Sequence, residues 1–568
     1  MKLAALISLI SCLMLTVRLA AAPPEIYPLD QLRPGMKGTV FTVLKGSEVV
    51  PIETEILGVL EGGLGPGRDM IIGKLVDPKT ELIQAVHGMS GSPLIIDGKL
   101  VGALSRRLGI FEKDGHCGFT PAADMVDVAR RRSLDPEPSA WPDAEQAVFT
   151  WVLSGFTSHP QNEMEGLKKL FPNHPLLSNL TTGRVGTGEK KLPPIQAGSP
   201  LAVVLMDGSI TLAGTGTATW VDGDQVVGFG HPMLGMGPVS FPIAPAEIIS
   251  VLPSYYMPFK IANAGKISGT LEQDRWSAVS GRIGPLPVMA RYEVNRTHQN
   301  QKRPPLEGHL VRDHRLAPFL LAILTMSAVV DRQDFSDNFT ARLSTSLKFT
   351  GLETLNMGGV FSGTQSERVE ILFGQTLPLM RLYSEYGEQL NLESVHMNVD
   401  TFERKENWTI ESVETDRDTV RPGESVLLVI KLRNPAGQEK IVRQPWKAPE
   451  TRIGSTLRIE VAGGIDLRRE KVFSSSLGRS SSPQDAIRWL NQTHRSDAIH
   501  VRTTMSGGVV RFEGGVEQTG LPHSIGSILA TESSASGYVQ HSPHILQESL
   551  ITGHGVVVGK KVKTIKLL

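Results

Sequence analysis

Cysteine is nearly absent from this chain of 568 residues, which contains only Cys12 and Cys117. Cys12 lies in an apolar N-terminal segment that we expect to be removed, and Cys117 alone cannot form an intramolecular disulfide. Neither sign of charge is in excess, because Lys and Arg together number 58 and so do Asp and Glu. A formal net charge of zero provides no overall field that would attract nucleic acid or an anionic membrane.

Motifs for metals and phosphates are also missing. The sequence has no His-Glu-x-x-His, no Cys-x-x-Cys, no twelve-residue calcium loop and no Gly-x-x-x-x-Gly-Lys segment. Its longest internal apolar run, residues 316–330, contains Pro318 and is too short for an unstrained membrane span, so it predicts a buried helix. We therefore expect no metal, no cofactor and no nucleic-acid partner.

The N-terminal segment has the pattern of a secretory signal peptide. Lys2 precedes an apolar stretch at 3–17, and three alanines at 20–22 resemble a cleavage site. Cleavage near Ala22 or Pro23 predicts a secreted or periplasmic protein. An uncleaved membrane anchor and a lipoprotein cleaved at Cys12 are the two alternatives.

The hexapeptide Gly88-Met89-Ser90-Gly91-Ser92-Pro93 is the most informative motif present. A serine between glycines and before a proline is how many serine peptidases present a nucleophile. Tight turning at the glycines would let the N–H groups of Gly88 and Ser90 point at one spot, where they could stabilise an oxyanion. The alternative is a tight turn between strands that has no chemical role.

The segment after this motif predicts a defined order of elements. Residues 94–96 and 99–104 read as strands joined by an Asp97-Gly98 turn of type I′, and residues 122–130 read as a short helix. Serine loop, hairpin, turn and helix in this order resemble the last part of a chymotrypsin-like β-barrel.

A second glycine-rich block carries a candidate general base. Residues 214–220 read as a strand, and Gly228-Phe229-Gly230-His231-Pro232 follows it. Small neighbours would leave the His231 imidazole approachable by a nucleophile. A structural or surface histidine is the alternative.

Together the two blocks resemble the peptidase family of stage IV sporulation protein B (SpoIVB), whose members are chymotrypsin-like serine peptidases. The resemblance covers residues 34–132 and 200–284. In the family the Gly-His block precedes the serine block, so the order here implies a circular permutation, with residues 139–192 as the connection. The PDZ module of such proteins has no counterpart in this sequence.

Carried over residue by residue, the resemblance implies a catalytic triad. Its nucleophile would be Ser90, its general base His231 and its acid Asp77, which stands before Pro78. Asp69 is a competing acid, and an aspartate before a proline is also a common turn residue.

The remaining chain predicts further β-rich units. Alternating polarity at 341–349 and 369–373 favours antiparallel sheet, and Ser482-Pro483 is a typical helix start after a serine-rich linker at 474–482. We expect a mainly β protein: a permuted, chymotrypsin-like double β-barrel followed by β-sandwich-like C-terminal domains. The expected divisions are a signal peptide at 1–22, a barrel half with the serine loop at 23–138, the connection at 139–192, a barrel half with the histidine at 193–300, an α+β extension at 301–405, an immunoglobulin-like β-sandwich at 406–470 and a β-rich segment at 471–568.

The leading functional hypothesis is a secreted or periplasmic serine endopeptidase that performs limited or regulatory cleavage of protein or peptide substrates. The alternative is a catalytically silent protein that binds or organises the cell envelope on a peptidase-like fold, with a cell-envelope partner held by the C-terminal β domains. The identity of the substrate and the oligomeric state are left open by the sequence.

Overall fold

The structure is a computed structural model. It divides into two compact units, of which the first comprises residues 1–154, 173–207 and 211–288 and the second comprises residues 155–172, 208–210 and 289–568. The expected signal peptide and most of the serine-rich linker at 474–482 lie outside the described residues. The described residues are 24–109, 114–131, 151–155, 161–178, 180–182, 192–254, 258–329, 338–364, 368–451, 454–473, 482–492, 494–505, 508–512, 517–521, 537–540 and 544–568.

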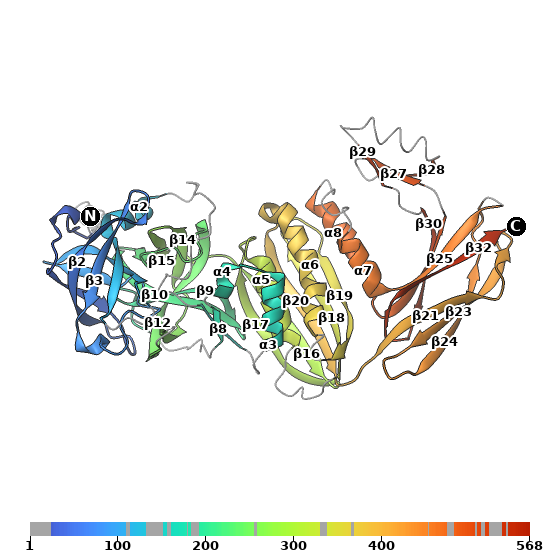
Figure 1. Cartoon of the computed structure of the whole chain (residues 1–568), viewed down its shortest axis with the longest axis horizontal. Helices are drawn as coiled ribbons and strands as arrows, with labels where there is room; N and C mark the ends of the chain where they lie inside the picture. Colours follow the sequence, from blue (N-terminus) through green and yellow to red (C-terminus); the bar gives the residue numbers. More distant parts are fainter. Residues whose placement is uncertain are drawn as a thin grey trace, which may run out of the picture. The chain divides into compact units, whose positions relative to one another are not determined.

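The first unit contains a closed six-stranded barrel that carries the serine loop (Figure 1). Adjacent strands are antiparallel, and alternate side chains along them point inward to an apolar core that includes Ile52, Ile71 and Phe119. Two 3-10 helices, η1 (Leu29–Gln31) and η2 (Pro78–Thr80), flank the barrel. Its strands are β1 (Lys37–Thr42), β2 (Val50–Gly65), β3 (Arg68–Leu75), β4 (Pro93–Ile96), β5 (Lys99–Arg107) and β6 (His116–Pro121).

The second half of this unit also closes into a six-stranded barrel, because β9 pairs with both β10 and β12. Its strands run β9-β12-β14-β15-β11-β10 around the ring, with β13 attached to β12, and with β7 and β8 beyond β10. The double β-barrel and the mainly β fold class are thus confirmed. The bounds are β7 (Trp151–Ser154), β8 (Leu180–Thr182), β9 (Pro200–Gly208), β10 (Thr211–Asp222), β11 (Gln225–Gly228), β12 (Gly237–Leu252), β13 (Phe259–Ala264), β14 (Gly269–Arg275) and β15 (Ala278–Ile283).

Local sequence rules hold well around the serine loop. Asp97 and Gly98 have φ angles of 49° and 77°, as a type I′ turn requires, and they join β4 to β5 where expected. The predicted short helix is α2 (Ala122–Arg130), which begins after Pro121 and packs on β5 and β15. This hairpin and helix anchor the end of the serine loop to the barrel wall.

The second unit begins with a five-stranded sheet in the order β19-β18-β20-β16-β17, covered by α5 and α6 (Figure 1). Helix α5 is buried along its whole length, as its apolar sequence predicts. Helix α3 packs against α6, and α4 lies in the first unit. The bounds are α3 (Gln161–Leu170), α4 (Pro175–Ser178), β16 (Met289–His298), β17 (Gln301–Val311), α5 (Ala317–Val329), β18 (Asn338–Phe349), β19 (Leu355–Thr364), α6 (Val369–Tyr386), η5 (Gly387–Gln389) and β20 (Leu392–Phe402).

The strand predicted at 369–373 is wrong, because these residues form the first turns of α6. Five residues that alternate in polarity fit a strand, but the apolar pattern continues in the helical period. The buried positions of α6 recur every three or four residues, at Ile371, Leu372, Gln375, Thr376, Leu379, Leu382 and Tyr383. The window of five residues was too short to distinguish the two periods.

The chain ends in a sandwich of two sheets, ordered β24-β23-β21-β31 and β22-β32-β25-β26-β30. Their facing side chains form one apolar core that extends from Ile410 to Leu567, so strands beyond residue 470 complete the sandwich. The predicted start of α8 is confirmed: the Ser482 hydroxyl accepts from the Asp485 N–H, and Pro483 is the first helical residue. The bounds are β21 (Asn407–Thr415), β22 (Thr419–Val420), β23 (Ser425–Arg433), β24 (Glu439–Lys447), β25 (Thr456–Gly463), α7 (Gly464–Phe473), α8 (Pro483–Asn491), β26 (Ala498–Met505), β30 (His544–Thr552), β31 (Val556–Val558) and β32 (Lys560–Leu567), with a separate small sheet of β27 (Gly508–Phe512), β28 (Glu517–Leu521) and β29 (Gly537–Gln540).

Candidate active site

The serine loop is a tight turn that leaves two N–H groups without an acceptor. Gly88 and Gly91 have φ angles of +97° and +90°, a region that favours glycine. The N–H groups of Met89, Gly91 and Ser92 donate to carbonyl oxygens 2.8–3.0 Å away, whereas those of Gly88 and Ser90 donate to no atom of the described residues. These two are the N–H groups that the sequence predicted as oxyanion donors.

The side chain of Ser90 is completely buried, and its hydroxyl has no hydrogen-bond partner among the described residues. Such an unsatisfied buried hydroxyl is uncommon, because leaving it unpaired costs about 1–3 kcal/mol. Gly216 on β10 faces it closely: a Cβ atom at this position would lie 3.0 Å from the Ser90 Oγ. A Cβ there would also lie 2.5 Å from the Phe229 ring, so glycine at 216 allows Phe229 and the Ser90 hydroxyl to pack together.

The two sequence blocks meet at this loop. The Thr217 N–H donates to the Ser90 carbonyl over 2.7 Å, and the Thr217 hydroxyl donates to the Gly88 carbonyl over 3.1 Å. One residue pair further along, the Thr219 hydroxyl donates to the Gly91 carbonyl over 2.8 Å. The serine loop is thus held by β10, the strand that leads through β11 to His231.

His231 lies just beyond β11 and is completely buried. Its Nδ1–H donates to the Pro232 carbonyl oxygen over 2.7 Å, and a carbonyl can only accept, so Nε2 is the unprotonated nitrogen of the neutral ring. Burial lowers the pKa of His231 from 6.5 to about 3, and the positive charge of Arg106 acts in the same direction. The ring is therefore neutral at pH 7 in the tautomer that a general base at Nε2 requires.

Asp274, at the end of β14, fixes the loop that follows the histidine. Its buried carboxylate accepts from the N–H groups of Met233, Leu234 and Met236 over 2.7, 2.8 and 3.3 Å. Desolvation raises the pKa of Asp274, while these N–H groups lower it. No local motif identifies this residue in the sequence, because its partners lie about 40 positions earlier.

Neither predicted acid contacts His231. The Asp77 carboxylate caps η2 by accepting from the Lys79 N–H over 2.9 Å, and it also accepts from the Glu53 N–H over 3.3 Å. It forms an ion pair with the Lys79 ammonium as well, at 3.1 Å. Asp69 accepts from the Gly62 N–H at the β2–β3 hairpin. Asp77 therefore acts as a turn residue, which was the alternative to a catalytic acid in the sequence analysis.

A lysine that sequence reasoning missed lies against the serine loop. The alkyl chain of Lys260 on β13 covers Gly88. A Cβ atom added at Gly88 would lie 3.1 Å from the carbon atoms of this chain. The Lys260 Nζ donates to the Thr42 hydroxyl over 2.9 Å, and burial lowers the pKa of this lysine from 10.5 to about 7. Lys260 is therefore a second titratable group beside the loop.

The described part of the first unit therefore combines a double β-barrel with a serine loop that is docked on a histidine block. No family model, curated protein or solved structure matches the chain. None of the described helices has both the length and the apolar character needed to cross a membrane.

Proposed function

We propose that this protein is a serine endopeptidase in which Ser90 is the nucleophile and His231 the general base. The observation that carries the proposal is the loop itself: the Ser90 hydroxyl has no hydrogen-bond partner, and the N–H groups of Gly88 and Ser90 in the same loop have no acceptor among the described residues. A turn that served only to connect two strands would gain stability by satisfying these groups. Leaving them open is what an oxyanion hole requires.

The Ser90 hydroxyl makes no hydrogen bond to His231 in the structure. In the proposed mechanism the two groups come together when the site opens, and Nε2 of His231 then takes the Ser90 proton as the hydroxyl oxygen attacks a peptide carbonyl carbon. The N–H groups of Gly88 and Ser90 stabilise the oxyanion that forms, and the protonated His231 then gives its proton to the leaving amine. The Pro232 carbonyl, which accepts from Nδ1, replaces a carboxylate as the group that sets the tautomer. Asp274 positions the following loop and does not touch the reacting atoms.

Complete burial of Ser90 and His231 means that a substrate can reach them only after the loops around them shift. Opening would admit water to the imidazole and bring its pKa back toward 6.5, near the value at which a general base works best. We propose that this closed state restricts cleavage to few targets. Limited proteolysis also agrees with the resemblance to SpoIVB peptidases, as does the secreted or periplasmic location that we propose.

A fluorophosphonate probe tests the proposal, because it reacts with an activated serine and needs no knowledge of the substrate. We expect labelling of the unmodified protein and its loss in Ser90→Ala. Ser92→Ala is the matched control, since Ser92 is equally buried in the same loop, where its hydroxyl lies 3.4 Å from that of Thr217. Labelling that persists in Ser90→Ala would exclude Ser90 as the nucleophile.

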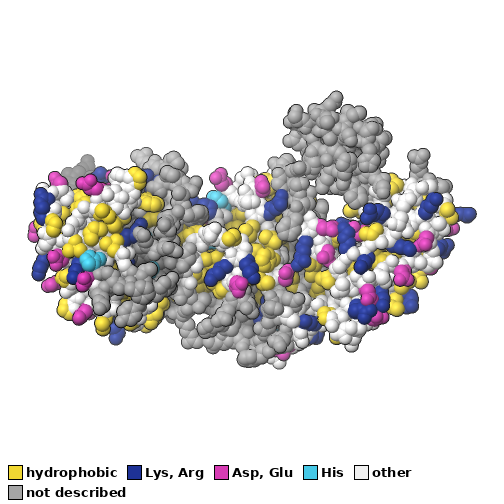
Figure 2. Space-filling model, viewed as in Figure 1, with side chains coloured by type: hydrophobic (Ala, Val, Ile, Leu, Met, Phe, Trp, Pro, Cys, Tyr) yellow, Lys and Arg dark blue, Asp and Glu magenta, His cyan; other side chains and the backbone are white. Residues whose placement is uncertain are grey.

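The same burial favours the second candidate, a catalytically silent binding or scaffold protein of the cell envelope. In that case the C-terminal sandwich would bind the partner, and the barrels would be structural. On the face drawn in Figure 2 the described acidic and basic side chains are intermixed, so this face offers no region of one sign to a charged partner. Absence of labelling and of peptide cleavage, with the protein correctly folded, would favour this candidate.

A further inference from the structure

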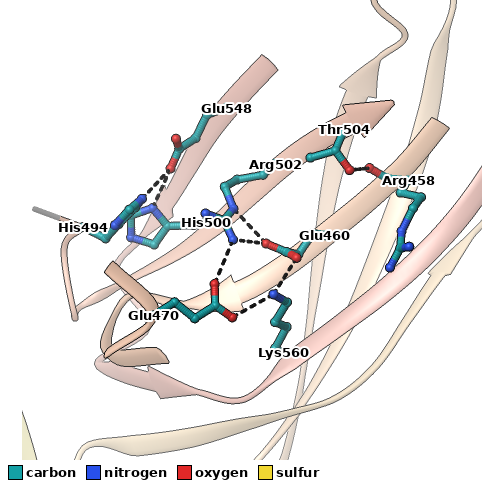
Figure 3. A network of polar contacts seen from close by, with 9 residues as sticks. All are labelled: Arg458, Glu460, Glu470, His494, His500, Arg502, Thr504, Glu548 and Lys560. Atoms are coloured by element: carbon teal, nitrogen blue, oxygen red, sulfur yellow. Dashed lines mark hydrogen bonds and ion pairs between the residues drawn. The ribbon is translucent and has the colours of Figure 1, made fainter. Parts of the chain in front are cut away.

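Two histidines and a glutamate converge at the edge of the C-terminal sandwich (Figure 3). His494 lies just before β26, His500 is on β26, and Glu548 is on the neighbouring strand β30. In the strand register His500 is opposite Leu550, so Glu548, two residues earlier on β30, is its diagonal neighbour on the same face of the sheet. The three side chains point toward one another.

The ligand atoms of this cluster are close enough to share one ion. The Glu548 Oε1 lies 3.1 Å from the His500 Nδ1 and 3.6 Å from the His494 Nε2. The three atoms lie within 4.8 Å of one another. A tetrahedral Zn²⁺ with bonds of about 2.0–2.1 Å places its ligand atoms about 3.3 Å apart. Both distances to the carboxylate are near that value.

The two ring nitrogens of His500 face different partners. The His500 Nε2 lies 3.0 Å from the Arg495 carbonyl oxygen, which can only accept, so this nitrogen carries the proton. The Nδ1 of the same ring faces the Glu548 carboxylate at 3.1 Å, a position from which its lone pair can bind a cation that the carboxylate also binds. A backbone carbonyl on the far nitrogen is typical of metal-binding histidines.

Two cationic side chains near the cluster, Arg502 and Lys560, already form ion pairs with other carboxylates. Arg502 is bound by Glu460 and Glu470, and Lys560 is bound by the same two carboxylates at 2.7 and 2.8 Å (Figure 3). These pairs neutralise Arg502 and Lys560, so neither displaces a metal ion from Glu548.

We propose that His494, His500 and Glu548 bind one divalent transition-metal ion of the Zn²⁺ type. The exposed fraction of the side chain rises from 3% at His500 through 19% at His494 to 35% at Glu548, so the carboxylate side is open to water as a fourth ligand. The ion would join β26, β30 and the segment before β26. It would act as a cross-link in a unit whose sequence contains no cysteine, and it is independent of the proposed peptidase chemistry.

Metal binding by the full chain, stripped with a chelator, tests this proposal. We expect Zn²⁺ titrated in a calorimeter to bind at one tight site and to raise the Tm by about 5 °C at saturation. Co²⁺ should give the visible absorption of a tetrahedral site. Glu548→Gln keeps the shape of the side chain and should weaken Zn²⁺ binding at least 10-fold, as should His500→Ala.

His396→Gln is the matched control. His396 also approaches a glutamate, with its Nδ1 4.0 Å from a Glu293 oxygen, but it belongs to no three-ligand cluster among the described residues. This variant should bind Zn²⁺ like the unmodified protein. Equal affinity in Glu548→Gln, or loss of binding in His396→Gln, would contradict the proposal. Absence of tight binding, together with nitrogen NMR shifts of a doubly protonated His500 at pH 7, would instead establish an imidazolium–carboxylate pair and overturn it.

Discussion

The N–H of Thr217 donates to the carbonyl oxygen of Ser90 over 2.7 Å, and this bond joins the serine block to the histidine block, which lie far apart in the sequence. The histidine block follows the serine block along the chain, yet β10 lies directly on the serine loop. A catalytic constellation depends on the positions of its groups and not on their order in the chain. The order of the two blocks in the chain is therefore no obstacle to the proposed chemistry.

Asp274→Asn should destabilise the first unit, because a neutral amide accepts poorly from the N–H groups of Met233, Leu234 and Met236. Loss of charge-assisted hydrogen bonds in a fully buried site predicts a decrease of about 2–3 kcal/mol in the free energy of unfolding. Urea denaturation measures it. Asp224→Asn, at an exposed turn of the same barrel, is the control and should change stability little. Equal effects of the two changes would show that the hydrogen bonds of Asp274 contribute little.

The burial of His231 predicts a dependence of stability on pH. The pKa of this ring is about 3 in the folded protein and near 6.5 when it is unfolded, so the unfolded state binds more protons between these values. The free energy of unfolding should then rise with pH by about 1.4 kcal/mol per unit from about pH 3 to 6.5, and this contribution should be constant above pH 6.5. Chemical denaturation at several pH values measures the slope, which should be smaller in His231→Gln. An unchanged slope would contradict the burial of a neutral ring.

Lys260→Met distinguishes the two titratable groups beside the serine loop. The pKa of Lys260 is about 7 when folded and near 10.5 when unfolded, so its contribution to stability should rise as pH increases from 7 to 10.5. Methionine retains the packing over Gly88 and removes the charge, so the variant should be more stable at pH 7 and should lack this rise. Fluorophosphonate labelling should persist if His231 is the base. Loss of labelling in a folded Lys260→Met would assign the base to lysine.

Asp77→Asn tests whether a carboxylate from the first barrel orients the histidine. The cap of η2 accounts for the contacts of Asp77, and asparagine caps helices about as well as aspartate. We therefore expect a loss of about 1 kcal/mol or less in stability and little change in labelling rate. A fall of several orders of magnitude in turnover by a folded variant would show that Asp77 reaches His231 in the active conformation.

Features that depend on a few consecutive residues were predictable from the sequence. The Asp97-Gly98 turn and the Ser482 cap follow from backbone conformations that these residues favour. The helix at 369–386 was missed because its first five residues also fit a strand. The partners of Asp77 could not be predicted either, since the same aspartate can cap a turn or orient a histidine.

Features that depend on strand register were not predictable. Lys260 lies against the serine loop because His87, at the start of the loop, accepts from the Lys260 N–H and donates to the Pro258 carbonyl, both over 2.9 Å. Similarly, His500 and Glu548 meet only through the pairing of β26 with β30. Neither set of residues has a characteristic spacing in the sequence, so no sequence motif indicates either site.

The most direct test of the central claim is the rate of fluorophosphonate labelling of the unmodified protein, of Ser90→Ala and of His231→Gln, measured beside a thermal melt of each. The account predicts labelling of the unmodified protein at Ser90, none in Ser90→Ala and a loss of at least about 100-fold in His231→Gln, with all three folded. Equal labelling of the unmodified protein and Ser90→Ala, or no labelling of a correctly folded unmodified protein, would contradict it.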